Sequence, residues 1–136
     1  MYVPHAGCIV QNFDDTIDQL RYVLQQGRNL KRRLVVGGDF NSQVNVGIRG
    51  AALESLSNAF GLNITNDGIN EWENDWTFRS STGVKRKIDF ILASRSLVVR
   101  DSIATNEIDM GSDHRAVKAR FDIGENVYWE KVGGLA

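Results

Sequence analysis

The stretch LVVGGDFN at residues 34–41 decides how the fold is interpreted and points to a site. Its apolar, β-branched start, followed by two glycines, predicts a buried strand. On an extended backbone alternate side chains share a face, so Asp39 and Asn41 would project together while Phe40 points into the core. A carboxylate and a carboxamide at a strand end favour catalysis. An Asx-turn that simply closes the strand is the structural alternative.

Hydrophobic patterns on both sides of this strand predict an α/β domain. A helix is expected at residues 12–26, N-capped by Asn12 and ended by Gly27, with one apolar stripe. A polar loop is expected at residues 43–50. A second helix is expected at residues 51–60, and further strands at 62–65, 76–79, 87–93, 97–103 and 116–121. A turn at residues 80–84 would join the 76–79 and 87–93 strands as a hairpin.

The strand at residues 87–93 carries an aspartate inside an apolar run. Alternation puts Asp89 on the face opposite its neighbours Ile88 and Phe90. A carboxylate in such a strand is costly unless it is paired or hydrogen-bonded. Asp89 therefore needs a partner, and a histidine is the expected one. His114, one of two histidines in the chain, lies in a polar loop expected at residues 109–115.

Acidic residues, an amide and a histidine near three strand ends suggest the chemistry of phosphate esters. A carboxylate can hold an imidazole in one tautomer, ready to accept or stabilise a proton. Carboxylate and amide oxygens are also the hard ligands that Mg²⁺ prefers. Together these groups describe metal-assisted hydrolysis of a phosphate ester. His114 by itself would more often be a structural residue.

Length and composition restrict the classes of protein considered. A chain of 136 residues, with 42% hydrophobic and 24% charged residues, forms one globular domain or part of one. No apolar run spans a membrane and no secretory signal is visible, and the single Cys8 excludes an intramolecular disulfide, which favours an intracellular protein. The net charge of −1 gives no overall nucleic-acid footprint. Basic residues cluster only at 28–33 and 85–87, where a solvated turn is the simplest interpretation.

Four motifs in this order resemble those of the endonuclease/exonuclease/phosphatase superfamily. They are YVP at residues 2–4, GDFN at 38–41, IDFIL at 88–92 and SDH at 112–114. The superfamily includes DNase I-like nucleases, apurinic/apyrimidinic endonucleases, inositol polyphosphate phosphatases and the endonuclease domains of non-LTR retrotransposons. The resemblance implies a DNase I-like sandwich of two β-sheets flanked by helices. A full domain of this family is considerably longer and starts with an Asn and a metal-binding Glu that have no counterpart here.

Only the C-terminal half of that fold is therefore expected. The partial domain would span residues 1–123, and residues 124–136 would form a C-terminal tail. The rest of the fold, or a reverse-transcriptase region, would belong to a longer protein.

The resemblance also implies a role for each matching residue. Asp39 would orient or deprotonate the attacking water, and Asn41 would hydrogen-bond the scissile phosphate or that water. Asp89 would orient His114, which would bind the phosphate and stabilise the developing charge. Asp113 would lie at or near a Mg²⁺ or Mn²⁺ ion.

Substrate contacts are implied by the same resemblance. Tyr2 would contact the phosphate through its hydroxyl. Lys85, Arg86 and Lys87 would lie near a phosphate backbone, and Trp76 would stack on a base. These residues favour nucleic acid, and DNA in particular, as the partner.

The sequence therefore predicts a fragment of a Mg²⁺-dependent phosphodiester hydrolase of the endonuclease type, derived from a retrotransposon. Little activity is expected of the isolated chain, because the Glu that binds the metal in this family has no counterpart. Two alternatives stay open. One is a phosphatase of inositol phosphates or lipid headgroups, which uses the same motifs. The other is a non-catalytic relic or binding module that keeps the fold without the chemistry.

Overall fold

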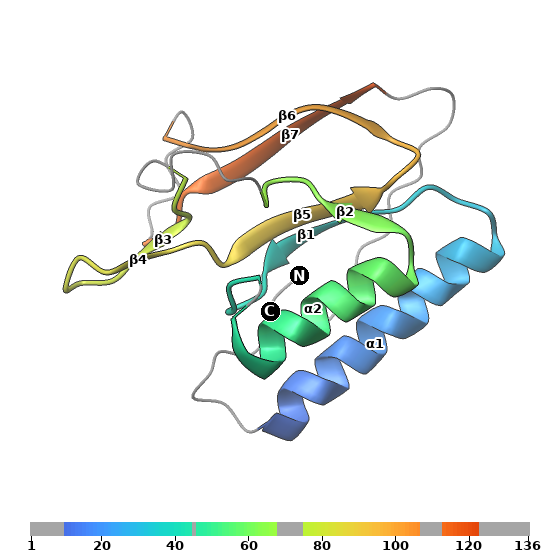
Figure 1. Ribbon diagram of the computed structural model, residues 1–136, viewed down its shortest axis with the longest axis horizontal. Coiled ribbons are helices and arrows are strands. Elements are labelled where there is room, and N and C mark those ends of the chain that lie inside the picture. Colours follow the sequence, from blue (N-terminus) through green and yellow to red (C-terminus); the bar gives the residue numbers. More distant parts are fainter. Residues whose placement is uncertain (1–9, 45, 68–74, 107–112, 123–136) are drawn as a thin grey trace.

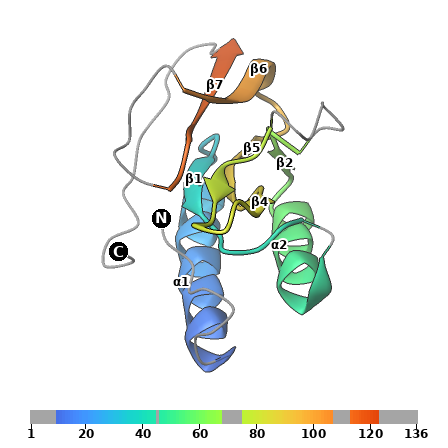
Figure 2. The ribbon, with the colours of Figure 1, turned by 90° about the vertical axis from the view of Figure 1, so that its left-hand side faces the viewer.

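The computed structural model describes residues 10–44, 46–67, 75–106 and 113–122. Helices α1 (Val10–Asn29) and α2 (Gly47–Ala59) cover one face of a three-stranded sheet. A ribbon of two strands, β6 (Val98–Thr105) and β7 (Ala116–Asp122), lies over the opposite face (Figures 1 and 2). The predicted α/β fold class is confirmed, and the layers run from helices through the central sheet to the ribbon.

The central sheet contains β1 (Val35–Asp39), β5 (Asp89–Ser94) and β2 (Leu62–Ile64) in the order β1-β5-β2. Both neighbours run antiparallel to β5. The three strands were expected at these places in the sequence. Their antiparallel pairing brings the end of β1 against the start of β5.

The hairpin predicted between residues 76–79 and 87–93 is wrong in its second strand. β3 (Phe78–Arg79) pairs with β4 (Lys85–Arg86), and the chain then leaves this ribbon and enters the central sheet as β5. In the central sheet β5 pairs with β1 and β2 instead of with β3. The turn between β3 and β4 is present, and Gly83 adopts a φ of 87° there.

Helix α1 extends beyond both predicted ends. It starts at Val10, so Asn12 lies inside the helix, and it runs through Gly27 to Asn29. Gly27 does not end the helix; a Cβ at this position would lie 2.4 Å from Cδ2 of Leu34. The chain leaves the helix at Lys31, two residues past its end, which has a φ of 56° and donates its N–H to the Arg28 carbonyl, while the Arg32 N–H reaches the Gly27 carbonyl. This is a Schellman motif with lysine at the left-handed position.

Helix α2 also begins earlier than expected, at Gly47, so half of the loop predicted at residues 43–50 is helical. Val46 precedes the helix without a side-chain hydrogen bond to it. The start of α2 therefore has none of the capping side chains that mark a helix start in a sequence.

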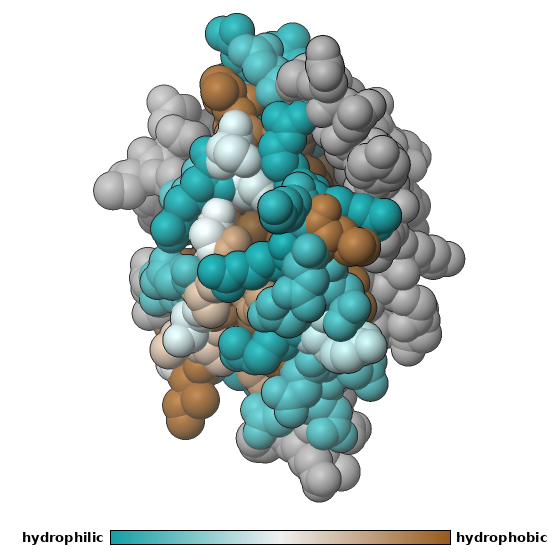
Figure 3. All heavy atoms as spheres, turned by 90° about the vertical axis from the view of Figure 1, so that its right-hand side faces the viewer, coloured by the Kyte–Doolittle hydropathy of each residue, from teal (hydrophilic) through white to brown (hydrophobic). Residues whose placement is uncertain are grey.

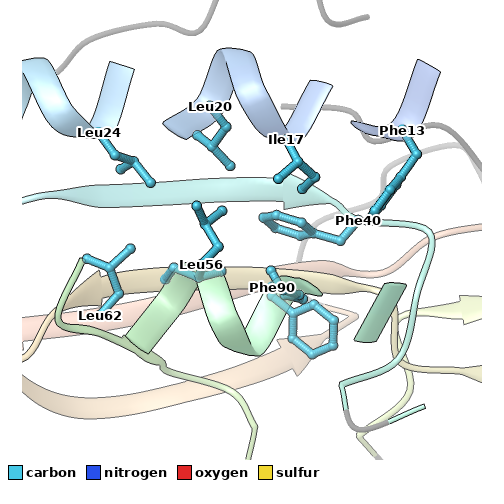
Figure 4. Packing of buried hydrophobic residues seen from close by; sticks show 10 residues of the cluster. Phe13, Ile17, Leu20, Leu24, Phe40, Leu56, Leu62 and Phe90 are labelled. Carbon is cyan, nitrogen blue, oxygen red and sulfur yellow. The ribbon is translucent and has the colours of Figure 1, made fainter. Parts of the chain in front are cut away.

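The core lies between the two helices and the sheet, as Figure 4 shows. Side chains of α1 face Phe40 and the α2 side chains across β1 (Figure 4). Phe40 points into the core as predicted, and the buried alternation of β5 matches its predicted apolar face. The buried members of this cluster are Phe13, Ile17, Leu20, Leu24, Phe40, Leu53, Leu56, Leu62, Phe90 and Leu92.

The end of the molecule at which α1 stops has a mostly hydrophilic surface, with hydrophobic side chains only in small separate groups (Figure 3). In the described part of the chain, no helix is both long and apolar enough to cross a bilayer. The strand end predicted at residues 2–4 and the tail predicted at residues 124–136 lie outside the described residues.

Candidate active site

The central sheet places two carboxylates next to each other. Asp39 is the last residue of β1, Asp89 is the first of β5, and the register pairs them directly. Both strand ends lie on the left-hand side of Figure 1, near β3 and β4. Like charges directly opposite each other destabilise a sheet, so this pair needs a compensating group.

His114 is the compensating group, and backbone pairing to β3 holds it in place. His114 forms an isolated antiparallel bridge with Phe78, and their rings lie 5.1 Å apart. The pairing continues on both sides: Arg79 donates its N–H to the carbonyl of Asp113 at 3.0 Å, and Arg115 donates to the carbonyl of Thr77 at 2.7 Å. The β3–β4 ribbon therefore positions the histidine beside the sheet.

The imidazole of His114 lies between the two carboxylates. Its Nδ1 is 2.8 Å from Oδ2 of Asp89, and its Nε2 is 3.7 Å from Oδ2 of Asp39. The side chains of His114, Asp39 and Asp89 are 28%, 20% and 18% exposed, so all three are reachable from solvent yet partly desolvated. Asp89 thus has the histidine partner that its place in an apolar strand required.

Asp39 also closes the strand through an Asx-turn. Its Oδ1 accepts the backbone N–H of Asn41 at 2.8 Å, and Asn41 has a left-handed φ of 49°. The prediction of an extended backbone through Asn41 is therefore wrong, because this hydrogen bond turns the chain. The structural alternative and the catalytic geometry coexist: one oxygen of Asp39 holds the turn and the other faces His114.

The pKa of the Asp39 carboxyl lies above its usual value of 3.8, mainly because partial burial disfavours the charged form. The Asn41 N–H opposes this effect, and the negative charge of Asp89 adds to it. The positive charges of His114 and Arg86 lower the pKa again without cancelling the rise. Asp39 is therefore an unusually basic carboxylate whose charge is incompletely compensated.

The three side chains offer ligand atoms that lie within 4.8 Å of one another. Oδ2 of Asp89 lies 2.8 Å from Nδ1 of His114, whereas Oδ2 of Asp39 is farther from the imidazole, 3.7 Å from Nε2. An incompletely compensated carboxylate attracts a cation, and Mg²⁺ binds through one or two carboxylates while it keeps several waters. Asp113, predicted at or near the metal, is exposed and is not one of this group. The described residues therefore fit a partly hydrated Mg²⁺ held through Asp39.

The predicted substrate contacts fall at different places around the β3–β4 ribbon. Lys85 is exposed, with its Nζ 5.6 Å from the centre of the Trp76 ring. Arg86 is half-buried, and its positive charge lowers the pKa of Asp39. Lys87 forms an ion pair with Asp75 and is mostly buried. Tyr2 lies outside the described residues.

More basic side chains lie close to the Trp76 ring than the sequence suggested. Arg79 lies 5.5 Å from its centre and Arg115 lies 4.5 Å away, in addition to Lys85. Arg115 also donates to the Trp76 carbonyl at 3.0 Å. Such contacts order the basic side chains around the ring. Sequence reasoning missed Arg115, although it directly follows His114.

Two buried polar residues were also missed, Asn66 and Thr77. Thr77 lies between two aromatic residues in the sequence, and a lone hydroxyl in such a run was the only available signal. Asn66 lies in a loop-like stretch and gave no signal. Both contact the backbone around Asp89.

Comparison with known proteins identifies the family. Residues 1–118 match the family described as endonuclease-reverse transcriptase. The fold is similar to an endonuclease/exonuclease/phosphatase family protein from Leptotrichia buccalis C-1013-b, with a TM-score of 0.51 and 20% identity over 73% of this chain. The match covers 40% of that protein's length. No curated protein matches this chain. Because the family match spans most of its length, the chain belongs to the endonuclease-reverse transcriptases of the endonuclease/exonuclease/phosphatase superfamily.

Proposed function

We propose that this chain supplies the histidine-bearing part of the active site of a Mg²⁺-dependent endonuclease that hydrolyses phosphodiester bonds in DNA. The convergence of Asp39, Asp89 and His114 is the observation that carries the proposal. These residues come from β1, β5 and a segment paired with β3, so the fold must bring them together. A longer protein of retrotransposon origin that also contains a reverse transcriptase is the proposed context.

The proposed chemistry divides the two carboxylates by their environments. Asp89 accepts a hydrogen bond from the Nδ1–H of His114. This bond holds the imidazole in one orientation and leaves Nε2 directed toward the reacting phosphate. Asp39 keeps one oxygen on the Asn41 amide and uses the other to orient the attacking water and accept its proton. In the metal-free chain the raised pKa of Asp39 makes it a better proton acceptor than an ordinary aspartate.

A divalent cation completes the proposed site. The cation would lie beside Asp39, which would contact one of its bound waters, and further waters would occupy the remaining positions. The cation supplies Lewis-acid polarisation of a phosphate oxygen. The described residues provide few ligands, so weak activity of this chain alone is part of the proposal.

DNA is favoured over a small phosphate ester because the basic residues extend beyond the site. Arg79, Lys85 and Arg115 gather around Trp76, and Arg86, next to Lys85 in β4, lies close enough for its charge to lower the pKa of Asp39. Several cations suit a chain of phosphates better than a single phosphate. Trp76 is proposed to order these cations, because its ring already contacts them.

The test is nicking of supercoiled plasmid by the purified chain at high concentration. We expect slow nicking that requires Mg²⁺ or Mn²⁺ and stops with a chelator. Asp39→Asn and His114→Gln should each lower the rate by about 10²–10⁴-fold, the range of general acid–base catalysis. Asp18→Asn, which changes an exposed carboxylate on α1, is the matched control and should nick like the native chain.

Other results would contradict the proposal. Nicking that survives both substitutions would come from a contaminant. Release of inorganic phosphate from inositol phosphates without nicking would indicate the phosphatase alternative. A chain that neither nicks DNA nor binds Mn²⁺ in a titration would indicate a non-catalytic protein.

A further inference from the structure

The backbone around Asp89 lies at a change of partners in the central sheet. On one side of β5, β1 continues to Asp39, and the Phe40 N–H reaches the Ile88 carbonyl at 2.8 Å. On the other side, the register of β2 ends where Ile64 pairs with Leu92. The Thr65 N–H, one residue past β2, still reaches the Ile91 carbonyl at 2.8 Å. The N–H groups of Ile88, Asp89 and Ile91 and the carbonyl of Asp89 need partners that a strand does not provide.

Asn66 provides the first of these partners. Its Nδ2 donates to the Asp89 carbonyl at 2.9 Å, and its Oδ1 accepts the Ile91 N–H at 3.1 Å. A carboxamide carries the same donor and acceptor as a peptide group, so this side chain replaces the next residue of β2. Asn66 is only 3% exposed, and water therefore cannot easily take over these bonds.

Thr77 provides the second partner. Its Oγ1 accepts the N–H of Ile88 at 3.0 Å and the N–H of Asp89 at 3.1 Å, and the residue is fully buried. Together with Asn66, it binds both the N–H and the carbonyl of Asp89. The backbone carbonyl of Thr77 also accepts the N–H of Arg115, the residue after the histidine. Thr77 thus holds Asp89 with its side chain and the His114 segment with its main chain.

We infer that Asn66 and Thr77 are positioning residues that fix the Asp89 backbone so that its carboxylate meets Nδ1 of His114. The inference rests on the proposed function, because it assigns them to the Asp89–His114 pair. Loss of either side chain leaves buried peptide groups without partners. The backbone then shifts to reach water, and the 2.8 Å contact between Asp89 and His114 is lost.

The tautomer of His114 reports this contact directly. While Asp89 accepts from Nδ1, the neutral imidazole must carry its proton there, whereas an unheld imidazole prefers the proton on Nε2. Long-range ¹H–¹⁵N spectra of the ring nitrogens distinguish the two forms. The chain has two histidines, so in a His5→Gln background the only histidine signals come from His114. The measurement uses the folded chain and requires no activity.

Thr77→Val keeps the shape and removes the hydroxyl, while Thr77→Ser restores it. We expect the Nδ1–H form in the native chain, a several-fold gain of the Nε2–H form in Thr77→Val and Asn66→Ala, and recovery in Thr77→Ser. Ser57→Ala is the matched control, since it removes a buried hydroxyl that bonds only within α2. It should keep the Nδ1–H form.

The outcomes separate this inference from the proposed function. If folded Thr77→Val and Asn66→Ala keep the Nδ1–H form, both residues are merely structural and the inference is wrong. The Asp89–His114 pair and the proposed function are then not contradicted. If the native chain already shows Nε2–H, the Asp89–His114 pair and the proposed function fail together.

Amide hydrogen exchange of the native chain tests the inference should the variants not fold. The N–H groups of Asp89 and Ile91 should exchange as slowly as the Phe40 N–H, which donates a backbone hydrogen bond to the Ile88 carbonyl. Fast exchange at Asp89 and Ile91 would overturn the inference.

Discussion

At the scale of single residues, Asp39 shows a conflict between stability and chemistry. It faces Asp89 across the sheet and is partly buried, and both effects raise its pKa. The Asn41 amide and His114 only partly offset them. Such a carboxylate costs stability when ionised, and this cost is typical of a residue retained for function.

The raised pKa of Asp39 predicts how stability changes with pH. The folded chain binds the Asp39 proton more tightly than the unfolded chain, so its stabilising effect is complete below the usual value of 3.8 and is lost as pH rises through the folded pKa. Asp39→Asn keeps the acceptor for the Asn41 N–H and removes this loss. We expect the variant to gain stability relative to the native chain as pH rises to neutrality.

Urea denaturation across the acidic to neutral range measures this difference. Asp18→Asn changes an exposed carboxylate and should show no such trend. A native chain that becomes more stable relative to Asp39→Asn with rising pH would contradict the raised pKa.

Lys31 is a second residue at which conformation and residue type disagree. Its φ of 56° is costly for a residue with a Cβ, by roughly 1–2 kcal/mol, and glycine adopts it freely. Lys31→Gly should raise the free energy of unfolding by about 0.5–1 kcal/mol after the greater chain entropy of glycine is subtracted. Lys31→Ala, measured by the same urea denaturation, should bring no gain. Equal effects of the two substitutions would mean that the left-handed turn carries no strain.

At the scale of elements, the contact between α1 and β1 explains why the helix passes through Gly27. The absent side chain leaves room for Leu34, which packs against the core just before β1. The helix can therefore continue to Asn29 and approach the strand closely. A glycine in a helix interior costs about 1 kcal/mol relative to alanine, and here it permits a close packing contact.

The contact predicts a non-additive pair of substitutions. Gly27→Ala gains helix propensity but pushes the new methyl against Leu34, so its net effect on stability should be small. In a Leu34→Ala background the clash is absent, and Gly27→Ala should then stabilise by about 1 kcal/mol. A double-mutant cycle in urea measures the coupling. Additive effects would show that α1 can move away from β1 at little cost.

At the scale of the whole molecule, the hydrophobic core and the candidate site occupy different parts of the sheet. The core fills the space between the helices and the sheet, whereas Asp39, Asp89 and His114 lie at the sheet end beside the β3–β4 ribbon (Figures 1 and 4). The ribbon therefore carries both the histidine segment and the basic residues. Changes in those basic residues should affect binding more than stability.

Binding of DNA should therefore depend on the ribbon, although the net charge of the chain is −1. Lys85→Gln and Arg86→Gln should each weaken binding to a DNA duplex and lower the slope of log affinity against log salt by about one. Arg21→Gln on the exposed face of α1 is the charge-matched control and should leave both unchanged. Fluorescence anisotropy over a salt series gives the slopes. Equal losses in all three variants would indicate non-specific attraction.

The sequence by itself determined which face of β5 is buried, the apolar stripe of α1, and the need of Asp89 for a partner, because these follow from local periodicity and from the cost of an unpaired charge. The order of the motifs also indicated the family. Only the tertiary structure decided that β5 pairs with β1 and β2 and not with β3, and that Asn41 turns left-handed. Strand pairing and the side chains that support it, Asn66 and Thr77, depend on contacts between residues far apart in the chain, and local patterns do not encode them.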